Sequence, residues 1–281
     1  MSARLYTTVD VEPSGFTLDS NTLVVSLGSC FADEMGRRLQ EGGFDVELNP
    51  FGTLYNPASI ADGLSRLMEG RPIDGSDLVR HDGLWHSWCH HGSFSRTDRD
   101  ECLAVCNCRM AEARTALLKA RLLMVTFGTA WVFEHGGRVV ANCHKVPAAE
   151  FARRRMTVDE VVALWRPLLQ RLQEFNPDLR VLFTVSPIRH MADTAHGNQL
   201  SKSVLLLSVD ALGVDYFPAY EIVLDELRDY RFYASDLVHP SDLAADIVYE
   251  RFQQCFMTAR TIEQARLNAK ALRRQRHIPL H

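Results

Sequence analysis

Residues 23–36 read LVVSLGSCFADEMG, an apolar run that stops at a glycine and continues in a helical pattern. A buried strand that ends at Gly28 places Ser29 and Cys30 at the N-terminus of the following helix. The free backbone N–H groups and the positive end of the helix dipole favour a developing anion at that point. They also lower the pKa of a thiol, whose thiolate is the reactive form. The stretch therefore predicts a nucleophile and an oxyanion donor in one turn.

The same turn also has a purely structural interpretation. Gly-Ser before a helix is an ordinary N-cap, and Cys30 can serve as a small buried apolar residue. A catalytic role requires a base elsewhere in the chain, and the segment Asp236-Leu237-Val238-His239 supplies one just ahead of a predicted helix. A carboxylate three residues before a histidine can hold one ring nitrogen while the other faces a nucleophile.

The composition narrows the class of protein. The chain has 281 residues, of which 46% are hydrophobic and 23% charged, and its formal net charge is −4. This balance is typical of a globular protein and argues against binding to nucleic acid or to an anionic membrane. We find no signal peptide and no membrane-spanning stretch. Seven cysteines, an odd number, indicate reduced thiols and a cytoplasmic location.

Apolar runs alternate with helical patterns along the chain, which is typical of one α/β domain over residues 1–281. We expect strands over residues 23–27, 44–48, 122–127, 181–185 and 214–217. We expect helices over residues 31–41, 58–68, 100–119, 158–174, 198–212 and 241–256. A hairpin over residues 131–140 has its turn at Gly136-Gly137. Residues 72–99 read as an irregular insertion, and residues 258–281 as a helical tail.

This alternation predicts a mostly parallel sheet with helices on both faces, in three α/β/α layers. Ligands of such sheets bind at the carboxyl ends of the strands. Three polar clusters follow predicted strands, at residues 28–30, 128–129 and 186–190. The sequence therefore predicts a site at this edge of the sheet.

The turn at residues 28–32 reads Gly-Ser-Cys-Phe-Ala, and the chain resembles the GSCFA domain family, which is itself similar to SGNH (GDSL-type) hydrolases. The resemblance runs to about Phe256. Further motifs that carry it lie at residues 49–52, 126–131, 142–145, 186–190, 201–202 and 228–233. The SGNH likeness implies a flavodoxin-like sheet.

The SGNH likeness also implies roles for individual residues. It places the nucleophile on Cys30, with Ser29 as the alternative if the turn is shifted by one residue. It places the orienting carboxylate and the base on Asp236 and His239. The oxyanion donors it implies are the glycines of two further blocks, Gly52 and Gly128. The third block departs from the family pattern, because Ala130 stands where SGNH hydrolases have an oxyanion-hole asparagine. We expect Thr129, Asn56 or a backbone N–H to replace the lost donor.

The resemblance implies an esterase, thioesterase or acyltransferase, and a Cys nucleophile favours thioesters and activated esters. The histidines and cysteines over residues 89–108 lack the spacing of a zinc site, so we expect no metal, and we expect no cofactor. A catalytically weak ligand-binding protein and a thiol carrier or redox protein are the alternatives. The oligomeric state stays open.

Polar residues near the predicted edge suggest a basic rim for an acidic acyl donor or acceptor. Surface salt bridges to Asp193, Asp215 and Glu221 are the alternative. The rim residues are His144, Lys145, Ser186, Arg189, His190 and Lys202.

Overall fold

Five apolar segments pair in parallel as the central sheet of the computed structural model, which describes residues 7–11 and 15–276. The strands are β1 (Val24–Gly28), β2 (Val46–Leu48), β5 (Leu122–Phe127), β9 (Arg180–Val185) and β10 (Asp215–Tyr216). Their order is β10-β9-β5-β1-β2. This is the flavodoxin-like order, in which the chain reverses direction across the sheet between β1 and β5. The predicted three-layer α/β fold is confirmed.

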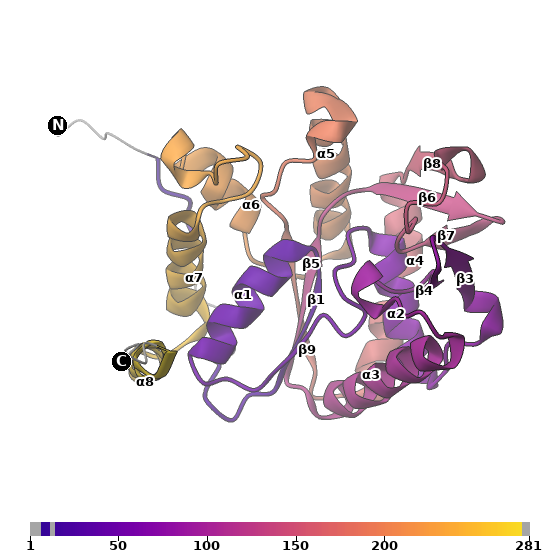
Figure 1. Ribbon diagram of the computed structural model, residues 1–281. Coiled ribbons are helices and arrows are strands. Elements are labelled where there is room, and N and C mark those ends of the chain that lie inside the picture. The colour runs from indigo at the N-terminus through magenta and orange to yellow at the C-terminus, as the bar shows by residue number, and fades with distance from the viewer. Residues whose placement is uncertain (1–6, 12–14, 277–281) are drawn as a thin grey trace, which may run out of the picture.

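Helices cover both faces of the sheet (Figure 1). Alternate strand residues point to opposite faces, so Val25 and Phe127 enter one hydrophobic core and Val24 and Leu122 the other. The first core packs against α2 (Pro57–Glu69), α3 (Arg99–Lys119), α4 (Val158–Phe175) and α5 (Thr194–Leu212). The second packs against α1 (Cys30–Glu41), α6 (Ala219–Glu221), α7 (Asp242–Phe256) and α8 (Ala259–Arg276). Residues 277–281 of the predicted helical tail lie outside the described residues.

An accessory sheet of three antiparallel strands follows β5. It comprises β6 (Trp131–His135), β7 (Arg138–Val140) and β8 (Ala152–Arg155), in the order β7-β6-β8. The hairpin predicted over residues 131–140 is confirmed, whereas β8 was not predicted. The expectation of an irregular segment over residues 72–99 is wrong, because a second hairpin forms there. Its strands are β3 (Leu78–His81) and β4 (Leu84–Ser87).

Short helical turns complete the chain. Those of the 3₁₀ type are η1 (Gly75–Asp77), η2 (Gly92–Phe94), η3 (Ala148–Glu150), η4 (Met191–Asp193) and η6 (Tyr230–Phe232), and η5 (Ile222–Glu226) is a π-helical turn. Within residues 7–11 and 15–276, no helix combines the length and apolarity needed to cross a membrane.

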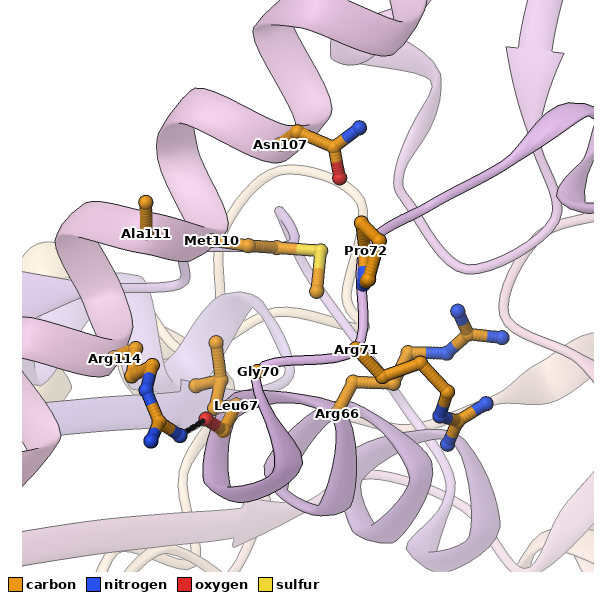
Figure 2. A pocket seen from close by; sticks show the side chains of 9 residues that line it. All are labelled: Arg66, Leu67, Gly70, Arg71, Pro72, Asn107, Met110, Ala111 and Arg114. Atoms are coloured by element: carbon orange, nitrogen blue, oxygen red, sulfur yellow. Dashed lines mark hydrogen bonds between the residues drawn. The ribbon is translucent and has the colours of Figure 1, made fainter.

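Helix α2 has a distinct cap at each end. At its start, the Asn56 side chain accepts a hydrogen bond from Ser59 N at 2.8 Å, and Pro57 occupies the first helical position. At its end, a small cavity of about 220 Å³ lies between α2 and α3, and Figure 2 shows the side chains that line it. The Arg114 guanidinium donates there to the carbonyls of Leu67 and Met68. A cation on the terminal carbonyls of a helix stabilises it, so we assign this cavity a structural role.

The end of β1 passes unusually close to β5. Gly28 has a φ of +147°, and a Cβ atom there would lie 2.2 Å from the Thr126 carbonyl oxygen. The Gly28 N–H donates to Asn49 Oδ1 at 2.9 Å, and Asn49 Nδ2 donates in turn to Asp33 Oδ1 at 2.7 Å. A residue without a side chain is therefore required at the point where the chain leaves the sheet for α1.

We expect Gly28→Ala to lower the free energy of unfolding by about 2–4 kcal/mol, because it adds a clash to an unfavourable φ. Urea denaturation followed by circular dichroism measures this loss. Gly83→Ala is the matched control, since Gly83 has a φ of +77° but open space around it. It should cost only about 1 kcal/mol. Equal losses in the two variants would show that the close approach to β5 contributes nothing.

Candidate active site

Residues from the two ends of the chain meet at the carboxyl edge of the sheet. Cys30 is the first residue of α1, and its Sγ lies 3.8 Å from His239 Nε2. On the other side of the ring, His239 Nδ1 lies 2.6 Å from Asp236 Oδ2. The sulfur, the imidazole and the carboxylate therefore form a continuous row of the kind found in nucleophile–base–acid triads.

The Asp236–His239 turn fixes the carboxylate as well as the ring. The N–H groups of His239 and Val238 donate to Asp236 Oδ1 at 3.0 and 2.9 Å. These two bonds, with the one from the His239 ring, lower the pKa of Asp236 to about 2. Leu237, which lies between Asp236 and Val238, has a φ of +58°, which is uncommon for a leucine. Asp236 is thus an anion throughout the neutral range and holds His239 with its second nitrogen toward Cys30.

Ser29 occupies a different environment from Cys30. It is buried as the N-cap of α1, where its Oγ accepts a hydrogen bond from Phe31 N at 3.3 Å. Its hydroxyl does not line the cavity that contains Cys30 and His239. The geometry therefore favours Cys30 over Ser29 as the nucleophile.

The expected lowering of the Cys30 pKa is wrong. Burial raises the pKa of this thiol above its ordinary value of 9.0, and the carboxylates of Asp33 and Glu34 raise it further. The N–H groups of Cys30 and Phe31 lower it, but burial has the larger effect. The field of the helix terminus is thus offset by desolvation and by two acidic residues in the first turns of α1. Cys30 is a neutral thiol at rest and needs His239 to take its proton.

Cys30 and His239 open into a cavity of about 590 Å³. Its walls come from the turn after β5, the accessory sheet, the segment around η4, and the Asp236–His239 turn. Besides Cys30 and His239, the lining residues are Tyr55, Asn56, Thr129, Trp131, Phe133, Val140, Ala141, Asn142, Cys143, Arg153, Ile188, Arg189, His190, Met191, Ala192, Asp193 and Val238.

Two of the expected oxyanion donors are already in use. The Gly52 N–H donates to the Asn49 carbonyl at 2.7 Å, and Gly52 packs against His91 rather than lining the cavity. The Gly128 N–H donates to the Tyr55 carbonyl at 2.8 Å. Both glycines therefore serve to shape turns, and the expectation that they donate to an oxyanion is not supported.

Three other donors remain at the cavity. The Cys30 N–H lies in the first turn of α1 and has no acceptor within its helix. Asn56 uses only its Oδ1 in the α2 cap, so its Nδ2 has no partner among the residues that the structure describes. The Thr129 hydroxyl accepts from Trp131 N at 3.2 Å and lies 3.0 Å from Ser201 Oγ. Ser201 Oγ also accepts from the N–H of buried Ala130, which explains why Ala130 contributes no donor.

Only part of the predicted basic rim faces the cavity. Arg189 and His190 line it, whereas Lys202 and Ser186 do not. Lys202 is fully buried, and its Nζ donates to the carbonyls of Gly128 and Ser186 at 2.6 Å each. Burial lowers its pKa to about 7. Ser186 Oγ accepts from Ile188 N at 3.3 Å. Lys202 and Ser186 thus fix the ends of β5 and β9 instead of contacting a ligand.

The other two rim residues also lie outside the cavity. His144 is buried, and its Nε2 lies 2.8 Å from the Ser87 carbonyl oxygen. Its ring stacks on His86, and burial lowers its pKa to about 4. Lys145 is exposed. The turn at residues 142–145 therefore packs the accessory sheet against the β3–β4 hairpin through His144. A ligand-binding role for His144 and Lys145 is not supported.

Phe133 and Arg153 are cavity residues that were not predicted as site residues. Trp131 and Phe133, two residues apart, lie on the same face of β6. Arg153 on the neighbouring β8 stacks on Trp131, with 4.3 Å between the guanidinium carbon and the ring centre. Arg153 also pairs with Asp193 of η4. The alternation of the two aromatics was a readable signal for an apolar wall, but the pairing of β6 with an arginine-rich β8 was not.

The sequence model of the GSCFA family matches residues 23–252. The chain belongs to the GSCFA family. No curated protein matches it. Similar solved structures include a protein described as a GDSL-like lipase from Parabacteroides merdae ATCC 43184, at 12% identity and a TM-score of 0.42, covering 85% of this chain and 97% of that one.

Two further solved structures match this chain with similar identity, coverage and TM-score. A family 3 carbohydrate esterase from Talaromyces cellulolyticus is 10% identical, with a TM-score of 0.40 over 87% of this chain and 98% of the other. The periplasmic domain of a lipopolysaccharide acetyltransferase from Salmonella ser. Paratyphi A is also 10% identical, with a TM-score of 0.40 over 85% of each chain.

We expect alkylation of Cys30 by iodoacetamide to accelerate with pH along a curve whose midpoint lies above 9.0, because only the thiolate reacts and burial raises its pKa. Peptide mass spectrometry at a series of pH values separates Cys30 from the other six free cysteines. A midpoint below pH 7 would instead show a resting thiolate–imidazolium pair between Cys30 and His239.

Proposed function

We propose that this GSCFA protein is an acyl-transfer enzyme in which Cys30, His239 and Asp236 act together on a thioester or an activated ester. The observation that carries the proposal is the continuous row from Cys30 Sγ through His239 to Asp236, at 3.8 and 2.6 Å. The row opens into a cavity large enough for a small acyl compound.

In the first half-reaction, Cys30 Sγ attacks the carbonyl carbon of the acyl donor while His239 Nε2 takes the thiol proton. The tetrahedral intermediate then collapses, the bond from carbon to the leaving sulfur or oxygen breaks, and His239 returns the proton to that atom. Asp236 stabilises the imidazolium that exists between these two transfers. The product is an S-acyl-Cys30 thioester and a protonated leaving group.

In the second half-reaction, water or an acceptor alcohol, amine or thiol attacks the acyl carbon. His239 takes the proton of this nucleophile, the carbon–Sγ bond breaks, and the proton passes to the departing Cys30 sulfur. A thioester intermediate is close in energy to a thioester substrate, which favours thioesters as donors. The same chemistry gives a hydrolase with water and a transferase with any other acceptor.

The developing oxyanion needs hydrogen-bond donors other than Gly52 and Gly128, because the N–H groups of both glycines already donate to backbone carbonyls. The Cys30 N–H, the free Nδ2 of Asn56 and the Thr129 hydroxyl are the available groups on the cavity wall. Donors that are fixed before the reaction stabilise the intermediate without reorganisation. Asn56 is held by its cap bond to Ser59 N, and Thr129 by its bonds to Ser201 and Trp131 N.

Acyl transfer is favoured over a redox or carrier role because Cys30 Sγ lies 3.8 Å from His239, a base that Asp236 holds in place. We place the enzyme in the cytoplasm, because thiols such as that of Cys30 stay reduced there. The substrate is a small acyl compound, and the state of assembly is left open.

We expect Cys30→Ala to lower kcat/KM for acetyl thioesters and p-nitrophenyl acetate by about 10³-fold or more, because the nucleophile is removed. Ser29→Ala is the matched variant on the adjacent residue. It should lose roughly 1 kcal/mol of stability with the N-cap and keep most of its activity. Loss of activity in Ser29→Ala with retention in Cys30→Ala would transfer the nucleophile to Ser29, and full activity in both would exclude the mechanism.

We expect Asn56→Asp to lower kcat by about 10²–10³-fold while leaving the melting temperature nearly unchanged. Aspartate keeps the Oδ1 acceptor that caps α2 but lacks the Nδ2 donor. Asn56→Ser, which also caps but adds no charge, separates loss of the donor from electrostatic repulsion. Wild-type kcat in Asn56→Ser would show that Asn56 only caps the helix.

A further inference from the structure

One arginine of the active-site cavity has no counter-ion. Arg189 lines the cavity together with Cys30 and His239. Within residues 7–11 and 15–276, no carboxylate pairs with its guanidinium, which donates no hydrogen bond to another residue there. The other arginine of the cavity, Arg153, is paired with Asp193. A guanidinium presents a rigid fork of donors suited to carboxylate and phosphate oxygens.

The remaining titratable groups of the cavity do not balance this charge. Burial lowers the pKa of His190 to about 4, so its imidazole is neutral at neutral pH. Asp236 already accepts hydrogen bonds from the His239 ring and from two backbone N–H groups. Asp193 is committed to Arg153. Among the described residues that line the cavity, Arg189 is therefore an arginine without an ion-pair partner, whereas Arg153 has one.

The cavity is thus bipolar. The backbone N–H of Arg189 donates to the Val238 carbonyl at 3.2 Å, which holds the main chain at Arg189 beside the residue that precedes His239. Trp131, Phe133 and Val140 form the wall from the accessory sheet, where Arg153, already paired with Asp193, lies over the Trp131 and Phe133 rings. Figure 1 shows this sheet and the segment before α7 on opposite sides of the upper ends of β1 and β5. Cys30 starts α1, two residues after the end of β1.

We propose that Arg189 binds a phosphate or carboxylate on the leaving group of the acyl donor, while an apolar acyl group packs on Trp131 and Phe133. This inference rests on the proposed function, because it orients the substrate across the same nucleophile. The carbonyl lies at Cys30, the bond to the leaving sulfur breaks on the Arg189 side, and that sulfur takes its proton from His239. The leaving group keeps its anion throughout, so no further co-reactant is required.

Four thioesters test this orientation by kcat/KM in the wild type and in Arg189→Gln. Butyryl-coenzyme A carries phosphates on the leaving side, butyryl-glutathione carries carboxylates there, and butyryl-N-acetylcysteamine is neutral. Succinyl-N-acetylcysteamine carries its anion on the acyl side. We expect Arg189→Gln to lower kcat/KM by about 10–100-fold for the coenzyme A or the glutathione thioester, and by less than about 2-fold for the neutral one.

The pattern of losses decides the proposal. A loss with coenzyme A identifies phosphate as the bound group, and a loss with glutathione identifies carboxylate. An equal loss with all four thioesters, a loss confined to the succinyl compound, or no loss with any of them overturns it. Arg231→Gln is the matched control, because Arg231 is an exposed arginine outside the cavity that pairs with Asp229. It should leave all four values unchanged.

A binding measurement separates this inference from the proposed chemistry. Calorimetric titration of the Cys30→Ala protein with coenzyme A and with glutathione requires no turnover. We expect Arg189→Gln, introduced into Cys30→Ala, to weaken binding of the preferred compound by about 10-fold or more. Absence of thioester turnover in the wild type would contradict the proposed function, whereas unchanged binding after loss of Arg189 would contradict this inference.

Discussion

The close approach of β1 and β5 at Gly28 is the constraint on which the site depends. The two strands pair from Val24 to Gly28, and at the last pair the chain must pass against the Thr126 carbonyl before it turns into α1. Asn49 holds this exit by accepting from the Gly28 N–H and donating to Asp33 in the first turn of α1. The direction of α1, and with it the position of Cys30, follows from these contacts.

A second set of contacts holds His239 opposite Cys30. The hydrogen bond from the backbone N–H of Arg189 to the Val238 carbonyl joins the Asp236–His239 turn to the segment after β9. Lys202 donates to the carbonyls of Gly128 and Ser186, which follow β5 and β9, and it does not line the cavity. His239 therefore lies opposite Cys30 because the ends of β5 and β9 and the Asp236–His239 turn are fastened to one another. The long separation along the chain does not weaken this arrangement.

The architecture was readable from the sequence because the central strands are continuous apolar runs and the helices have clear caps. The pairing of Cys30 with His239 was readable from motifs placed at strand ends. The Cys30 pKa was not, since burial and the carboxylates of Asp33 and Glu34 act against the helix terminus. The role of Lys202 was equally hidden, because its two partners are backbone carbonyls that only the folded sheet brings together.

Strand β8 shows a different limit. Its sequence, Ala-Arg-Arg-Arg, has no apolar alternation, and its residues are largely exposed. It forms because β6 offers a free edge and because Arg153 can stack on Trp131 and pair with Asp193. Such a strand is specified by its neighbours rather than by its own composition.

The accessory sheet has a consequence for how this protein can diversify. It is inserted between β5 and α4, and it supplies Trp131, Phe133 and Val140 to the cavity. The contacts described for the Cys30 and His239 positions come instead from α1, β5, the Asn49 loop and the segments around Arg189 and Asp236. Substitutions in residues 131–155 that retain the Arg153–Asp193 pair can therefore reshape the wall while Cys30 and His239 keep their spacing. The selectivity and the chemistry that we propose thus depend on largely different segments, so evolution or engineering can change the wall with little change at Cys30 and His239.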